Sequence, residues 1–91
     1  MITRINQFKA AEGKSDELHA FLKSLAPYIT SSAGSISFET LKSASDPYAF
    51  VVIEKWMNIE SHQKSVAAFP KEKMQAAMSL FGGPPKGEYY S

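Results

Sequence analysis

The central hydrophobic pattern of the chain is the unbroken apolar run 49–53, which continues through Glu54 and Lys55 to Trp56. β-Branched and aromatic side chains of this kind favour a strand, and we predict one over residues 48–57. A strand that is apolar at consecutive positions has two apolar faces, and both need cover. The chain's own helices can cover one face, and we expect a second copy of the chain to cover the other.

Three further segments alternate between two faces with the period of a strand, at residues 2–8, 36–43 and 86–91. Residues 44–47 have the composition of a turn, so the second and third strands are expected to form a hairpin. In the last strand Tyr89 and Tyr90 point to opposite faces, and we expect at least one of them at a dimer seam.

Two stretches carry apolar residues at helical spacing. The first is predicted to begin at Ser15, a good N-cap residue, and to end at Ser31. Pro27 removes one backbone donor and is predicted to kink the last turn of this helix. The apolar face of the helix is formed by Leu18, Phe21, Leu22, Leu25 and Ile29.

The second helical stretch begins after Asn58, which we expect to cap a short helix with Ile59, His62 and Val66 on its inward face. A Phe-Pro pair at 69–70 ends or bends this helix, and another short helix follows. The inward face of that helix is formed by Met74, Ala77, Met78 and Phe81. The sequence Gly-Gly-Pro-Pro at 82–85 then stops it.

The predicted order of elements is therefore β-α-β-β-α-(α)-β in one domain spanning residues 1–91. This order is that of the split βαβ, or ferredoxin-like, arrangement of the α+β class. It predicts an antiparallel sheet with the helices on one face, which leaves the second apolar face of the sheet for a partner.

Composition excludes several classes of function. Ten basic and nine acidic residues are spread along the chain without a basic cluster, so we expect no nucleic-acid partner. No apolar run approaches the length of a membrane span and no leader is evident, so we expect a cytoplasmic protein with no membrane contact. There is no cysteine, no metal-ligand spacing between the two histidines and no phosphate-binding loop, so we expect neither metal nor cofactor.

Short motifs along nearly the whole chain resemble the antibiotic biosynthesis monooxygenase domain. These motifs are Gly34-x-x-x-Phe38-Glu39, Asp46-Pro47, Phe50-x-x-x-Glu54-x-Trp56, Ile59-Glu60-Ser61-His62 and Gly83-Pro84-Pro85. The resemblance implies a dimeric α+β barrel, in which two ferredoxin-like sheets pack face to face in a homodimer. Some members of the family oxidise phenols, quinols or anthrones with O2 and no cofactor, others bind and degrade haem, and many have no assigned activity.

The chain departs from this family at two positions. Many family members carry a histidine at the position of Ser65, and here the nearby histidine is His62, almost one helical turn earlier. The haem-degrading members share an asparagine on the first strand, which Asn6 matches, but their tryptophan lies in a helix and a further histidine follows. Trp56 lies on a predicted strand and no histidine follows His62, so haem binding is the less favoured alternative.

Three residues are candidates for catalysis. His62 can accept a phenolic proton, while Asn6 and the indole N–H of Trp56 can donate to the resulting oxyanion. Each also has an ordinary structural interpretation: a satisfied core histidine, an anchor for the strand and an aromatic side chain that closes the core. Glu54 is expected to line the site as a hydrogen-bond anchor, with Arg4 as a possible partner, or to act as a base.

The remaining wall of the pocket, between the sheet and the helices, is expected to come from Phe38, Phe69, Met74, Met78 and Phe81. The sequence therefore predicts a cofactor-independent monooxygenase that oxidises a small aromatic phenol, quinol or anthrone. The alternative is a non-catalytic dimer that binds a small molecule or has only a structural role. An open cavity on which Glu54, His62 and Asn6 converge would favour a ligand site over a filled core.

Overall fold

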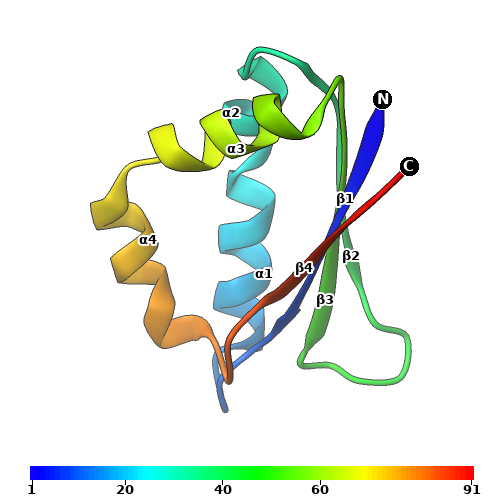
Figure 1. Cartoon of the computed structure of the whole chain (residues 1–91). Helices are drawn as coiled ribbons and strands as arrows, with labels where there is room; N and C mark the ends of the chain where they lie inside the picture. The colour runs from blue at the N-terminus through cyan, green and yellow to red at the C-terminus, as the bar shows by residue number, and fades with distance from the viewer.

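One antiparallel sheet with helices on a single face forms the structure, a computed structural model that describes residues 1–91 (Figure 1). The strands are β1 (Ile2–Lys9), β2 (Ser35–Lys42), β3 (Ala49–Trp56) and β4 (Lys86–Tyr90). The helices are α1 (Ser15–Ser24), α2 (Ala26–Ser31), α3 (Ile59–Ala68) and α4 (Lys71–Ala77), followed by the 3₁₀ turn η1 (Met78–Leu80). The predicted order of elements is confirmed.

The sheet has the strand order β2-β3-β1-β4, and every neighbouring pair is antiparallel. β3 lies between β1 and β2, which is the split βαβ arrangement expected from the sequence. The register places Arg4 of β1 opposite both Glu54 of β3 and Tyr89 of β4. Residues from three strands that are distant in sequence therefore meet on one face of the sheet.

The predicted kink near Pro27 is a break between two helices. α1 ends at Ser24, and the backbone N–H of Leu25 bonds to the carbonyl of Leu22, three residues back. Pro27 then lies in the first turn of α2, where its missing N–H would have no helical partner in any case. The expected N-cap at Ser15 is wrong by one residue: Lys14 is the N-cap, and the Ser15 hydroxyl donates to the carbonyl of Pro47.

α3 begins as predicted, because the Asn58 side chain accepts a hydrogen bond from the Ser61 N–H at 2.8 Å. Its inward face differs from the prediction: His62 is buried, whereas Ile59 is 40% and Val66 59% exposed. Figure 1 shows the reason, since α3 leaves the end of β3 and runs away from the sheet toward α4. A helix in this direction can bury only a narrow stripe of its surface.

The two faces of β3 differ sharply in burial. Phe50, Val52 and Trp56 point toward the helices and are each at most 1% exposed. Full burial of each such side chain contributes about 1.5–3 kcal/mol to stability. On the opposite face Val51 and Ile53 are only half-buried, and no helix covers them. The helix-covered face therefore holds the core, and the other face is open.

Candidate functional site

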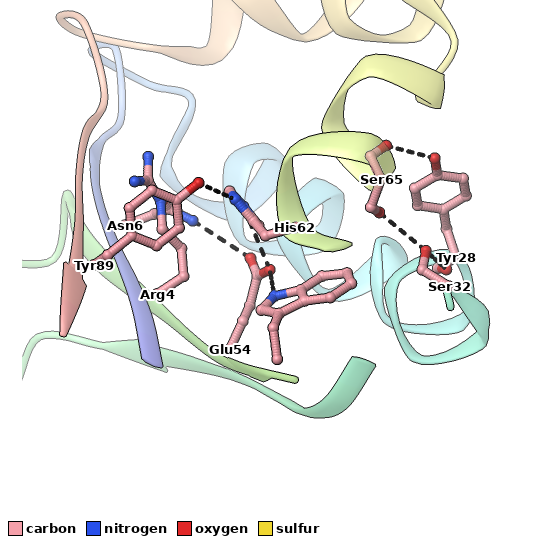
Figure 2. A network of polar contacts seen from close by, with 9 residues as sticks. Arg4, Asn6, Tyr28, Ser32, Glu54, His62, Ser65 and Tyr89 are labelled. Carbon is pink, nitrogen blue, oxygen red and sulfur yellow. Dashed lines mark hydrogen bonds and ion pairs between the residues drawn. The ribbon is translucent and has the colours of Figure 1, made fainter. Parts of the chain in front are cut away.

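Glu54 is the centre of a buried hydrogen-bond network on the helix-covered face (Figure 2). Its side chain lies on β3 and the residue is 4% exposed. One carboxylate oxygen accepts from the indole N–H of Trp56 at 2.8 Å, and the other accepts from the side-chain amide of Asn6 at 3.3 Å. Burial raises the pKa of Glu54, while the Trp56 bond, the positive charge of Arg4 and the Asn6 bond oppose that rise.

Asn6 connects Glu54 to Arg4. Its amide oxygen accepts from Nε of Arg4 at 2.9 Å, and its amide nitrogen donates to Glu54. The two contacts fix the orientation of the amide, because oxygen and nitrogen each face the only group that suits them. The Arg4 guanidinium lies over the ring of Tyr89, with its central carbon 4.5 Å from the ring centroid.

His62 reaches this network from α3. Its Nδ1 lies 2.7 Å from the Tyr89 hydroxyl, and its Nε2 lies 3.9 Å from a carboxylate oxygen of Glu54. The imidazole also packs edge-on against the Trp56 ring, with the centroids 5.5 Å apart. Burial, followed by the positive charge of Arg4, lowers the pKa of His62. The surroundings of His62 and Glu54 thus favour the uncharged form of both groups.

Ser65 stands where many family members have histidine, and its contacts are those of a structural residue. Its hydroxyl lies 2.9 Å from the hydroxyl of Ser32, and its carbonyl accepts from the hydroxyl of Tyr28 at 2.7 Å. These bonds tie α3 to α2. His62, rather than residue 65, is therefore the side chain that α3 contributes to the Glu54 network.

A cavity of about 270 Å³ lies between the sheet and the helices, and Asn6, Glu54 and His62 all line it together with Arg4 and Trp56. Most of its remaining wall is apolar and comes from the core side of α1, the end of α2 and the segment after α3. The three polar residues that we expected to converge thus meet at an open cavity. The indole N–H of Trp56 is bonded to Glu54, so a ligand oxygen could reach it only by replacing that bond.

Among the expected apolar wall residues, Phe69, Met74 and Phe81 line the cavity. Phe38 and Met78 do not: Phe38 packs against the main core cluster, and Met78 is 60% exposed in the turn η1. The contact between Tyr89 and His62 was not expected from the sequence. The sequence did contain one indication of this contact, because Tyr89 and Tyr90 are successive residues of a strand and one of them must lie on the same face as Arg4.

A larger cavity of about 560 Å³ lies between the first two helices and the segment that carries α3 and α4. Its lining contains Lys73 but no carboxylate and no histidine. Both cavities share the side chains of Phe21, Leu25, Tyr28 and Phe69 as lining. The carboxylate of Glu54 and the imidazole of His62 line only the smaller cavity, which is therefore the candidate active site.

No cluster of three or more histidine or acidic side chains is placed to hold a metal ion. No helix has both the length and the apolar character that crossing a membrane requires. The polar network at the site consists of the side chains of Glu54, His62, Tyr89, Arg4, Asn6 and Trp56.

The family model for antibiotic biosynthesis monooxygenase matches residues 1–78 of the chain. The chain belongs to this family. The match includes β1, β3 and α3, which carry Arg4, Asn6, Glu54, Trp56 and His62, and stops before the strand that carries Tyr89. No curated protein matches the chain by sequence.

Solved structures show the same fold at low sequence identity. A protein from Nitrosomonas europaea that carries the family's name is 20% identical with a TM-score of 0.88, covering 100% of this chain and 97% of that one. SnoaB from Streptomyces nogalater, described as a cofactor-independent oxygenase, is 15% identical with a TM-score of 0.84, covering 99% and 90%. Protein SO0527 from Shewanella oneidensis is 26% identical with a TM-score of 0.83, covering 98% and 87%.

Proposed function

We propose that this protein is a cofactor-independent monooxygenase that acts as a cytoplasmic homodimer on a small aromatic phenol, quinol or anthrone. The observation that carries the proposal is the convergence of Asn6, Glu54 and His62 on a mainly apolar cavity. A flat aromatic substrate suits such a cavity, and a few fixed polar groups suffice to orient it. Family membership and the fold shared with SnoaB support the reaction class.

The first task of such an enzyme is to remove a proton from the substrate, and His62 is placed to do this. In the tautomer with its hydrogen on Nδ1, His62 donates to the Tyr89 oxygen and leaves Nε2 free as a base. The lowered pKa keeps the imidazole neutral at physiological pH, which a base requires. Once protonated, Nε2 faces Glu54 at 3.9 Å, and an ionised Glu54 would stabilise the new positive charge.

The second task is the reaction with oxygen. Ground-state O2 is a triplet and reacts slowly with closed-shell molecules, whereas an electron-rich aromatic anion can give it one electron. The resulting radical pair combines into a carbon-bound peroxide, which takes up the proton and loses water to leave a carbonyl. For an anthrone the CH2 group plus O2 becomes C=O plus H2O, so the substrate supplies all the electrons. The protein's part is to hold the anion in a dry site.

The proposed homodimer rests on the open face of the sheet. Val51 and Ile53 are half-buried there, and Leu41 and Tyr90 are 45% and 52% exposed. An extended apolar surface on the open side of a sheet is typical of a protein interface. A second copy of the chain, packed sheet to sheet, would bury all four side chains and add to the thin core of a 91-residue domain.

The test is oxygen uptake by the purified protein with a panel of hydroquinones and anthrones, corrected for autoxidation. We expect saturable uptake that falls at least tenfold in His62→Asn and in Asn6→Ala. The matched control is His19→Asn, because His19 is the other histidine and lies on α1 outside the cavity lining. Turnover unaffected by His62→Asn and Asn6→Ala would rule out the proposed roles.

Absence of uptake above background across the whole panel would overturn the monooxygenase assignment. A non-catalytic dimer that binds a small aromatic ligand would then be the better account of the same cavity. A Soret shift on titration with haem would indicate the third alternative, and we expect none.

A further inference from the structure

The Arg4 guanidinium has hydrogen-bond donors that nothing in the chain uses. It lines the cavity, and its Nε donates to Asn6. A guanidinium carries five N–H groups, so four remain on the two Nη atoms. None of them makes a hydrogen bond within the chain, and no ion pair includes Arg4.

The position of this guanidinium is nonetheless well defined. The Tyr89 ring supports it from one side, and Asn6 holds its Nε. At Gly87 of β4, which pairs with Asn6, a Cβ atom would collide with Nη2 of Arg4. The absence of a side chain at residue 87 is what allows the guanidinium to lie across β4 beside the cavity.

The charge of Arg4 is not matched by the other groups of the cavity. Glu54 is the only carboxylate in the lining, and Asn6 lies between it and Arg4. Both Glu54 oxygens already accept hydrogen bonds, from Trp56 and from Asn6. A cation beside an apolar cavity with free, forked donors is suited to a planar anionic group.

From this arrangement we propose that the pocket takes a small aromatic acid, whose carboxylate pairs with the Nη atoms of Arg4 while its ring fills the apolar part. The cavity volume of about 270 Å³ lies just below the range of drug-sized ligand sites, which suits a small ligand. That the aromatic acid is the substrate rests on the monooxygenase function proposed above. That the pocket binds an aromatic acid does not depend on that function.

The test compares two probes of the same shape, 2-naphthoate and its neutral amide, 2-naphthamide. Trp56 is the only tryptophan of the chain and lines the cavity, so quenching of its fluorescence reports occupancy. We expect the wild-type protein to bind 2-naphthoate at least tenfold more tightly than 2-naphthamide, and the preference to shrink as salt is raised. Equal affinity for the two probes, or binding of neither, would overturn the proposal.

Arg4→Met keeps much of the side-chain length and removes the charge. We expect this variant to lower the affinity for 2-naphthoate at least tenfold and to change the affinity for 2-naphthamide less than twofold. The control Lys73→Met, in the larger cavity, should leave both affinities unchanged. Equal weakening of both probes would show that Arg4 only supports the shape of the cavity. Gly87→Ala is a second variant, which displaces the guanidinium without removing it and should lower the preference for 2-naphthoate.

The inference and the proposed function fail in different ways. Arg4-dependent binding of 2-naphthoate, without oxygen uptake for any substrate, would retain the acid-binding site and remove the monooxygenase. Two results together would retain the monooxygenase and remove the acid-binding site. One is oxygen uptake with neutral anthrones whose KM is unchanged in Arg4→Met, and the other is equal affinity for the two probes.

Discussion

The two faces of the sheet use the same strands for different purposes. Along β3, Glu54 and Trp56 point into the helix-covered side and are almost completely buried, while Ile53 and Lys55, which alternate with them, point to the open side. All the hydrogen-bonded polar groups of the candidate site lie on the covered side, whereas the open side combines half-buried apolar residues such as Val51 and Ile53 with charged ones such as Lys55. Because side chains alternate with a period of two, one strand can supply an active site and a docking surface at once.

The largest expected difference between the two faces of the sheet is in how much a substitution on each face lowers the free energy of unfolding. Trp56→Ala should lower the free energy of unfolding by about 3–5 kcal/mol, because it leaves a cavity in a closely packed region and removes a partner of Glu54. Ile53→Ala, on the open face of the same strand, should cost the isolated chain much less, about 1 kcal/mol. Urea unfolding of the two variants at low protein concentration measures both values. Equal losses would show that the faces do not differ as the structure indicates.

The second effect concerns assembly. Ile53→Lys places a charge in the middle of the open face and should raise the dimer dissociation constant at least 100-fold, about 2.7 kcal/mol. Gln63→Lys adds the same charge on the exposed side of α3 and is the matched control. Analytical ultracentrifugation across a range of concentrations compares them. A wild-type protein that is monomeric throughout, or a dimer that Ile53→Lys leaves intact, contradicts the proposed interface.

The third effect is a pH dependence that belongs to the covered face alone. Native His62 binds its proton less readily than the unfolded chain does, so its NMR titration midpoint should lie below the ordinary value of 6.5. Between that midpoint and about pH 6.5 the unfolded chain binds more protons at His62 than the native protein does. The contribution of His62 to the free energy of unfolding therefore rises with pH in this range. Glu54 acts in the opposite direction: its raised pKa makes stability fall as pH rises above 4.5 and through the native midpoint.

Comparing wild type with His62→Asn and with Glu54→Gln by urea unfolding at several pH values separates these two contributions. The His62→Asn protein should lose the rise in stability just below pH 6.5, and the Glu54→Gln protein should lose the fall that begins above 4.5. A His62 midpoint at or above 6.5 would show that the imidazole is not desolvated as described.

The smallest expected effect is the difference in stability between removing the hydroxyl of Tyr89, on the covered face, and removing that of Tyr90, on the open face. Tyr89→Phe removes the hydroxyl that bonds to His62 and should cost about 0.5–1.5 kcal/mol. Tyr90→Phe removes the same atom on the open face, where the residue is 52% exposed, and should change stability by less than about 0.5 kcal/mol. Thermal unfolding of both variants, with the His62 NMR signals as a local probe, tests the difference. A Tyr90→Phe loss equal to that of Tyr89→Phe would show that the His62 bond adds nothing.

Local patterns in the sequence predicted the fold well. The strand through Ile53 and the Asn58 cap depend on neighbouring residues, and both predictions are confirmed. Pro27 was expected to kink the last turn of one helix, and the structure has instead a break between α1 and α2 just before it. Element order then limits the sheet to few topologies, so the ferredoxin-like arrangement was also within reach of the sequence.

The site was less predictable because it depends on contacts between distant strands. The bond between His62 and Tyr89 joins α3 to β4, and the pairing of β4 beside β1 is not encoded locally. The inward face of α3 was predicted to carry Ile59, His62 and Val66. His62 is buried as expected, but the direction of the helix leaves Ile59 and Val66 exposed and buries Ser65 in their place. Tertiary packing there outweighs the hydrophobic pattern.

Two of the four side chains that line both cavities, Tyr28 and Phe69, form an aromatic pair whose rings meet edge to face with centroids 5.2 Å apart. The Tyr28 hydroxyl is fixed by its bond to Ser65, whereas Phe69 has no polar anchor. A rotation of the Phe69 side chain would change the shape of both cavities at once. The size of molecule that the protein admits, and the speed at which it enters and leaves, would then depend on how often a single ring turns.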